Sequence, residues 1–226
     1  NYRIAASAAN CTSGTVVASG TSSATADENE DTTWTPDSSI GSDAAYYWCA
    51  QNNDGSLTSD WTNMGSFTLD TAVPTTTDNF ANNDSWQASN QTITLTPTDA
   101  TAGVSWTKYC QDTTNACDPA SGTAYTSAVT ISTDGTSYFR YASQDNAGNT
   151  QTTQSKTVKI DATAPTTVIG ISREVNAITA TLTCADTSGS GCSLTYYCAD
   201  TDNTCAPSSL YTTPVAFSIF NASYFR

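Results

Sequence analysis

The chain carries an internal repeat with a period of about 90 residues. The segment 70–74, Asp-Thr-Ala-Val-Pro, recurs at 161–165 as Asp-Ala-Thr-Ala-Pro. Between these markers, a Tyr-Cys pair followed by six residues and a second Cys occupies 109–117 and returns at 197–205. Such a period corresponds to one small domain per repeat, so the sequence predicts a tandem array with domains at 1–73, 74–164 and 165–226.

The charge of the chain argues against two classes of partner. It has 7 basic and 21 acidic residues, which gives a formal net charge of −14. Proteins that bind nucleic acid carry basic patches, and anionic membrane surfaces attract basic segments, so we expect neither partner. No apolar run is long enough to form a membrane-spanning helix, and no span is predicted in this segment.

Eight cysteines without a single histidine indicate a disulfide framework. An even number of cysteines in Thr-rich sequence favours disulfides and an oxidising, extracellular compartment. A zinc site made of cysteine alone would need pairs separated by about two to four residues. The local pairs here are separated by six or seven residues. We therefore predict no metal centre.

The cysteines pair by proximity and by comparison between repeats. The predicted bonds are Cys11–Cys49, Cys110–Cys117, Cys184–Cys192 and Cys198–Cys205. The second and fourth bonds have the same spacing in consecutive repeats. The third flanks a turn-rich loop, and both of its cysteines are missing together from the preceding repeat. The first follows by elimination. Their expected role is to stiffen small domains.

Four Asn-x-Ser/Thr sequons predict N-linked glycan and point to the same compartment. They are Asn10, Asn83, Asn90 and Asn221.

Helical periodicity is nearly absent from the sequence. Instead, apolar and polar side chains alternate over short stretches. Period-two alternation rich in Thr, Val, Ile and Tyr indicates half-buried strands. In the middle repeat these stretches lie at 92–96, 104–109, 128–131, 137–142 and 156–160. About seven short strands per repeat are typical of an immunoglobulin-like antiparallel β-sandwich, so the predicted fold class is all-β, with tandem immunoglobulin-like domains. We expect Trp106 at the centre of the middle core.

Comparison with the middle domain predicts which strands the outer domains contain. In the first domain, 1–5, 45–50 and 65–70 correspond to strands C, F and G, so we expect it to lack its first strands. The third domain should lack its last strands. Either the chain is a window on a longer polypeptide, or neighbouring subunits donate the missing strands. We favour the window, because the two open ends are not complementary in a simple way.

The second and third repeats resemble a known type. The run 184–207, with its four cysteines, and the run Tyr-Phe-Arg-Tyr-Ala-Ser-Gln-Asp-Asn-Ala-Gly-Asn at 138–149 resemble the Cys-rich immunoglobulin-like repeats of archaeal surface proteins, notably from small-genome lineages. They are also similar to bacterial immunoglobulin-like repeats and to accessory modules of chitobiase-type enzymes. The resemblance implies an extracellular sandwich with structural or adhesive duties, and it supplies no catalytic residues.

The residue types present argue against catalysis. Without histidine the chain has no Ser-His-Asp triad and no Cys-His pair, so we predict that it is not an enzyme and needs no cofactor. Calcium is the alternative ligand, because carboxylate and amide oxygens suit it. The candidate groups are Asp27, Glu28, Glu30 and Asp31, or Asp145 with Asn149. We interpret the first group as a solvated loop and the second as a turn.

These observations predict a structural subunit or segment of an extracellular filament on a microbial, archaeal cell surface. Its partners would be other copies of itself, with cell-surface or carbohydrate ligands as a further option. The alternatives are an adhesin stalk, a surface-layer protein, or an accessory module of a secreted polysaccharide-degrading enzyme.

Overall fold

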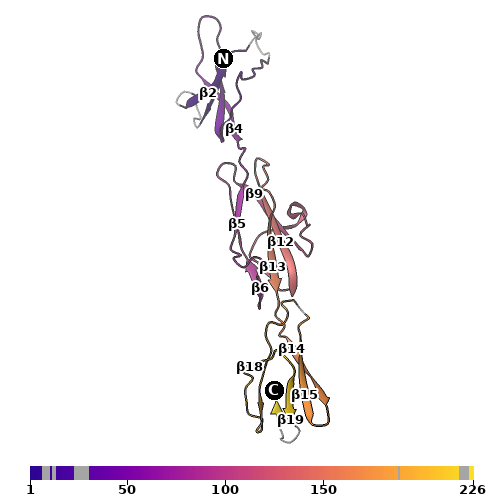
Figure 1. The fold of residues 1–226 in the computed structure, drawn as a ribbon. Helices are drawn as coiled ribbons and strands as arrows, with labels where there is room; N and C mark the ends of the chain where they lie inside the picture. The colour runs from indigo at the N-terminus through magenta and orange to yellow at the C-terminus, as the bar shows by residue number, and fades with distance from the viewer. Residues whose placement is uncertain (7–10, 12–13, 23–30, 188, 219–223) are drawn as a thin grey trace.

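The structure is a computed structural model that describes residues 1–226 except 7–10, 12–13, 23–30, 188 and 219–223. The described residues form an all-β protein with several antiparallel sheets, and their only helical element is the 3₁₀ turn η1 (Pro119–Ser121). Three groups of strands follow one another along an elongated molecule (Figure 1). Every strand pairing among the described residues stays within 1–73, 74–164 or 165–226.

The first group is one four-stranded antiparallel sheet with the order β2-β1-β3-β4. Its strands are β1 (Tyr2–Ala6), β2 (Thr15–Gly20), β3 (Ala44–Ala50) and β4 (Thr62–Leu69). On one face, the Cys11–Cys49 disulfide and Ala5 form a small buried cluster. The Arg3 guanidinium lies 4.2 Å from the centre of the Trp61 ring that packs near this cluster.

The middle group has two layers. One layer contains β5 (Thr75–Asp78) paired with β8 (Leu95–Thr98), and β7 (Gln91–Ile93) paired with β11 (Val129–Ile131). The other is a five-stranded sheet with the order β10-β9-β12-β13-β6. Its strands are β6 (Trp86–Gln87), β9 (Val104–Asp112), β10 (Thr123–Ala124), β12 (Gly135–Asp145) and β13 (Gln154–Ile160). In this sheet β6 runs parallel to β13, and the other pairings are antiparallel.

Apolar side chains from both layers meet to form the main core of the molecule. The fully or nearly buried members are Phe80, Ile93, Leu95, Ile131, Phe139, Tyr141, Val158 and Ile160. Burying such a set removes apolar area from water at roughly 25 cal/mol per Å², which is the main driving force for closing the two layers. This arrangement is consistent with a β-sandwich.

The expectation for Trp106 is wrong. On β9 the buried position is Thr107, and Tyr109 packs against the core from the same face. Because side chains alternate along a strand, Trp106 lies on the opposite, outer face. There its Nε1 donates to Gln144 Oε1 at 2.8 Å, and the Lys108 ammonium lies 5.0 Å from its ring centre.

The third group contains a three-stranded sheet with the order β14-β15-β19, formed by β14 (Thr166–Arg173), β15 (Ala177–Ala185) and β19 (Val215–Ser218). Two short pairs complete it. They are β16 (Tyr196–Tyr197) with β18 (Ser209–Leu210), and β17 (Ala199–Asp200) with β20 (Tyr224–Phe225). The Phe225 ring contacts the rings of Tyr197 and Phe217, and Ala180 is fully buried.

Candidate functional site

The two junctions between successive repeats are held by aspartates at equivalent positions of the repeats. Asp43 and Asp134 stand directly before β3 and β12, and Asp70 and Asp161 follow the final strands β4 and β13. The linkers that follow are the two copies of the repeated marker found in the sequence. Equivalent aspartates of successive repeats therefore occupy the same places at the two junctions.

The first half of each junction ties the linker to the repeat that precedes it. Asp43 Oδ1 accepts hydrogen bonds from the backbone N–H and the hydroxyl of Thr71, both at 2.9 Å. At the second junction Asp134 accepts from the Ala162 N–H at 3.2 Å and from the Thr163 hydroxyl at 3.1 Å. Both linkers thus leave their strand in a fixed direction.

The second half of each junction ties the linker to the repeat that follows it. Asp70 Oδ1 accepts from the Ala72 N–H at 3.1 Å, while its Oδ2 accepts from the Ala102 N–H at 2.9 Å. Asp161 repeats this with the Thr163 N–H at 3.2 Å and the Ser190 N–H at 2.8 Å. Both aspartates are more than nine-tenths buried. Hydrogen bonds to a buried charged group are worth about 1.5–3 kcal/mol each, so a single side chain fixes two repeats to each other.

An additional contact specific to each junction strengthens the joint. At the first junction, the Asn149 side-chain amide donates to the Asp70 backbone carbonyl at 2.9 Å. At the second, the Trp86 ring lies against Gly189, where a Cβ atom would come within 2.4 Å of the ring. Gly189 also has φ of +148°, a conformation that side chains rarely adopt. The second junction therefore requires glycine at this position.

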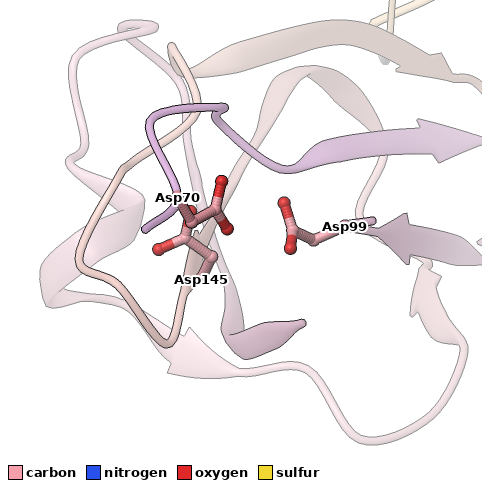
Figure 2. A group of neighbouring side chains, drawn as sticks. All are labelled: Asp70, Asp99 and Asp145. Atoms are coloured by element: carbon pink, nitrogen blue, oxygen red, sulfur yellow. The ribbon is translucent and has the colours of Figure 1, made fainter. Parts of the chain in front are cut away.

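Three carboxylates converge at the first junction. Asp70, Asp99 and Asp145 each place an oxygen within 4.8 Å of the others, and Figure 2 shows the three side chains pointing toward one another. Burial acts to raise the pKa of Asp145, but hydrogen bonds from the Asn149 side chain and from nearby backbone N–H groups outweigh it and leave the pKa below its usual value. The charged form is therefore stabilised.

These carboxylates are the residues that would hold a cation, since calcium prefers oxygen ligands. Each of them already accepts backbone N–H groups, from Ala72 and Ala102 for Asp70, from Thr101 and Gly103 for Asp99, and from Ala147 and Asn149 for Asp145. In this structure the three carboxylates therefore hold the linker and the neighbouring loops together by hydrogen bonds. Asp145 and Asn149 do lie together, in the turn that the sequence analysis favours. Asp27, Glu28 and Glu30 lie outside the described residues, and Asp31 is exposed.

The four disulfides join Cys11 to Cys49, Cys110 to Cys117, Cys184 to Cys192 and Cys198 to Cys205, which are the pairs proposed from the sequence. No free cysteine is present among the residues that the structure describes. Four disulfides indicate a protein located outside the cytoplasm. Of the glycosylation candidates, Asn83 and Asn90 are exposed, and Asn83 Oδ1 accepts from the Thr157 N–H. Asn10 and Asn221 lie outside the described residues.

Two of the disulfides close loops that are built around one aspartate each. Asp112 accepts from the N–H groups of Asn115, Ala116 and Cys117 at 2.8–2.9 Å. Asp200 does the same with Asn203, Thr204 and Cys205 at 2.7–2.9 Å. The backbone N–H groups of Ala116 and Thr204 contribute most to holding the pKa of the two carboxyls below its usual range. The repeated Cys-rich loop is therefore folded by its aspartate as well as by its disulfide.

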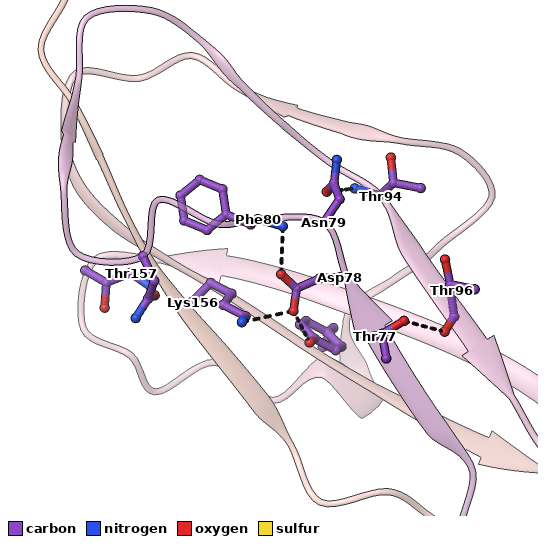
Figure 3. A network of polar contacts seen from close by, with 10 residues as sticks. Thr77, Asp78, Asn79, Phe80, Thr94, Thr96, Lys156 and Thr157 are labelled. Atoms are coloured by element: carbon purple, nitrogen blue, oxygen red, sulfur yellow. Dashed lines mark hydrogen bonds and ion pairs between the residues drawn. The ribbon is translucent and has the colours of Figure 1, made fainter.

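A cluster of polar side chains connects β5 and β13, the first and last strands of the middle repeat. Asp78, at the end of β5, accepts from the Tyr141 hydroxyl at 2.6 Å and forms an ion pair with Lys156 of β13 at 3.1 Å (Figure 3). Burial acts to raise the pKa of Asp78, but the bonds from Tyr141 and Lys156 outweigh it and lower the pKa. Because β5 follows one junction and β13 precedes the next, this group links the two ends of the repeat.

The first repeat carries an aromatic cleft of about 360 Å³. Tyr2, Trp34, Trp48 and Phe67 line it, and Trp34 stacks on Tyr2 with ring centres 5.7 Å apart. Trp48 and Phe67 keep 39% and 40% of their surface exposed. A concave site of this size, lined by four aromatic rings beside polar and aliphatic residues, is suited to a small molecule.

The sequence analysis missed the carboxylates that build the junctions and the loops. It treated Asp70 and Asp161 as markers and did not assign partners to them. The signal was present, because Asp43 and Asp134, like Asp112 and Asp200, occur at equivalent places in consecutive repeats. Recurrence of a polar residue at the equivalent place in consecutive repeats points to a structural task, and comparison of the repeats alone could have identified these four.

Comparisons of the chain with protein-family models, with curated proteins and with solved structures found no match. Among the described residues, no helix is long and apolar enough to cross a membrane.

Proposed function

We propose that this protein is a structural segment of an extracellular filament or appendage on a microbial, archaeal cell, built of tandem immunoglobulin-like domains at 1–73, 74–164 and 165–226. The observation that carries the proposal is the repeated junction. Asp70 and Asp161 make equivalent hydrogen bonds to the following repeat, and Asp43 and Asp134 make equivalent bonds to the linker. An array whose repeats act only as flexible spacers would not need equivalent hydrogen bonds between each repeat and the next.

The mechanism is mechanical. Load that enters the middle repeat through the first linker reaches β5, and it leaves through β13 and the second linker. The Asp78–Lys156 ion pair and the Tyr141 hydroxyl couple these two strands across the repeat. Local disulfides keep the loops folded, and the acidic surface keeps copies apart except where specific contacts form. Stiff repeats joined by fixed junctions are the properties that a filament or stalk requires.

The proposal is tested by negative-stain electron microscopy of protein released from its native source. Regular filaments of constant width, labelled by an antibody against the middle repeat, are the expected result. Free monomers alone would contradict the filament. Separate beaded rods would instead favour the second candidate, an adhesin stalk or surface-layer protein.

The aromatic cleft of the first repeat supports this second candidate, because partly exposed Trp48 and Phe67 could receive a cell-surface carbohydrate. Aromatic rings stack well against the apolar face of a sugar. Quenching of tryptophan fluorescence by a panel of neutral oligosaccharides would measure such binding, with a Trp34→Ala variant as the test of the site. No quenching by any sugar in the panel would leave the filament role as the only supported candidate.

A further inference from the structure

The loop of the third repeat that binds Asp161 is closed by a disulfide. Ser190 donates its backbone N–H and its hydroxyl to Asp161 Oδ2, at 2.8 and 2.5 Å, and the preceding Gly189 lies against a tryptophan ring of the middle repeat. Cys192 follows Ser190 by two residues and is bonded to Cys184, which lies on β15. The residues that contact the middle repeat at the second junction therefore belong to a small, covalently closed loop.

The first junction has the same loop without a disulfide. Pro97 stands at the place of Cys184, because each is opposite the second residue of the first strand of its repeat. Val104 stands at the place of Cys192, because each lies six residues before the cysteine of the repeated Tyr-Cys pair. The loop of the middle repeat still binds its aspartate, Asp70. The disulfide is therefore a feature of the second junction only.

This disulfide is also the one that a reagent in solution reaches most easily. Cys192 is exposed, whereas the other seven cysteines are half-buried or buried. Cys11, Cys49 and Cys198 each keep less than a tenth of their surface exposed. Thiol–disulfide exchange requires a thiolate to reach one of the two sulfurs, so access decides which bond is attacked first. The exposed bond is therefore the one that closes the loop at the second junction.

We propose that the Cys184–Cys192 disulfide is a redox-sensitive lock on the second junction, opened by a small external thiol. This inference rests on the proposed function, since it names the regulation of one of its fixed junctions. In the reaction, a thiolate attacks the Cys192 sulfur to form a mixed disulfide, and Cys184 leaves as a thiolate that takes up a proton. A second thiol then releases Cys192 as a thiol. Two electrons enter the protein, and the two small thiols leave as one disulfide.

Reduction loosens the junction because it restores conformational freedom to the loop. In the oxidised protein the bond to Cys184 already restricts the loop, so the hydrogen bonds from Ser190 to Asp161 order few additional dihedral angles. In the reduced protein the same hydrogen bonds must order the whole loop, and the entropy of that ordering opposes them. The loop-closure account predicts that the ratio of open to closed second junctions rises about tenfold or more.

Distances between spin labels on the full chain, measured before and after limited treatment with reduced glutathione, test the lock. The labels are attached by chemistry that does not use cysteine, so the thiol does not release them. The distribution between the middle and third repeats should change from narrow to broad, and that between the first and middle repeats should stay narrow. A chain with both Cys184→Ala and Cys192→Ala should be broad at the second junction from the start and should not respond to glutathione.

The matched control opens another small loop of the same repeat. A chain with both Cys198→Ala and Cys205→Ala loses a disulfide of sequence separation 7 that takes no part in the bonds to Asp161. Its second junction should be narrow before glutathione and broad afterwards, like that of the wild type. A control chain that is already broad before treatment would overturn the proposal, because the junction would then depend on the general stability of the third repeat.

Alkylation of free thiols followed by peptide mass spectrometry shows which bond glutathione opens. Cys184 and Cys192 should be alkylated first, in step with the broadening at the second junction. Earlier alkylation of Cys110 and Cys117, or of the Cys198–Cys205 pair, would contradict the proposed order of access. A second junction that stays narrow when Cys184 and Cys192 are fully alkylated would overturn the lock.

These outcomes separate this inference from the proposed function. A distribution that stays narrow in both the oxidised and the reduced chain would overturn the lock and leave the fixed junction standing. A distribution that is broad in the untreated wild-type chain would contradict the fixed junction itself, on which the proposed function rests.

Discussion

At the scale of single residues, aspartates fix the loops of this protein, and the hydrogen bonds to Asp112 and Asp200 favour the charged carboxylate. Asp112 and Asp200 accept three backbone N–H groups each, so their folded pKa is lowered relative to the unfolded chain. A carboxyl with a lowered folded pKa contributes stability above its unfolded pKa of about 3.9, and this contribution is lost as the pH falls through the folded pKa. The melting temperature should therefore be constant near neutrality and fall below about pH 4.

Asp112→Asn and Asp200→Asn test this dependence. Each variant should melt below the wild type at pH 7, because a neutral amide offers weaker acceptance to the loop N–H groups. The difference should shrink as the pH approaches 2, where the wild-type carboxyls are protonated as well. Calorimetric melting curves across this pH range provide the measurement, with the exposed Asp37→Asn as control. A constant difference at all pH values would contradict the assignment of the charged form.

The Tyr141 hydroxyl gives a second prediction at this scale. Tyr141→Phe removes its 2.6 Å hydrogen bond to the buried Asp78 and keeps the ring in the core. Loss of a partner by a buried, charged acceptor costs about 1–3 kcal/mol, so the free energy of unfolding of the middle repeat should fall by that amount. Tyr138→Phe on the same strand is the matched control, since Tyr138 lies outside this network. Urea titration followed by tryptophan fluorescence would reveal the difference, and equal stability of both variants would argue against the role of Asp78.

At the scale of elements, alternation located the strands but not always their inward face. β9 carries large side chains in both phases, with Val104, Trp106 and Lys108 in one and Thr107 and Tyr109 in the other. The pattern alone therefore could not decide which face of β9 was buried. The prediction placed Trp106, the largest side chain of the strand, in the core, and this was wrong. β6 escaped prediction for another reason, because two residues carry no periodicity and their parallel pairing with β13 depends on tertiary contacts. The junction partners are 28–32 residues apart, a separation that local patterns do not encode.

The Cys184–Cys192 bond allows a prediction for one element, since the middle repeat has the same loop without a disulfide. Closing a loop of sequence separation 8 should stabilise the third repeat by roughly 2.5 kcal/mol in the loop-entropy account. Replacing both cysteines by alanine should lower the melting temperature of the third repeat and leave the middle repeat unchanged. Hydrogen exchange resolved by repeat would measure both in one sample. Simultaneous loosening of the middle repeat would mean that the bond does more than close its loop.

At the scale of the whole molecule, the junctions decide whether three repeats behave as one rod or as three beads. Asp70→Ala and Asp161→Ala each remove a side chain that accepts N–H groups from the linker and from the next repeat. The repeats should stay folded, because no strand pairing depends on these residues, but the angle between neighbouring repeats should vary more widely. Distances between labels on the first and third repeats, measured by electron-spin resonance, should change from a narrow to a broad distribution. Asp60→Ala, an exposed substitution in the first repeat, should leave the distribution narrow.

The second junction differs from the first because it depends on Gly189. Gly189→Ala should loosen the second junction alone, because its Cβ would push against the Trp86 ring and its φ of +148° disfavours a side chain. Distances between the first and middle repeats should then stay narrow while those between the middle and third repeats broaden. Broad distributions in the wild-type chain itself would contradict the fixed joint. In that case the repeated aspartates would order only their own linkers, and the stiffness of any filament would have to come from contacts between copies.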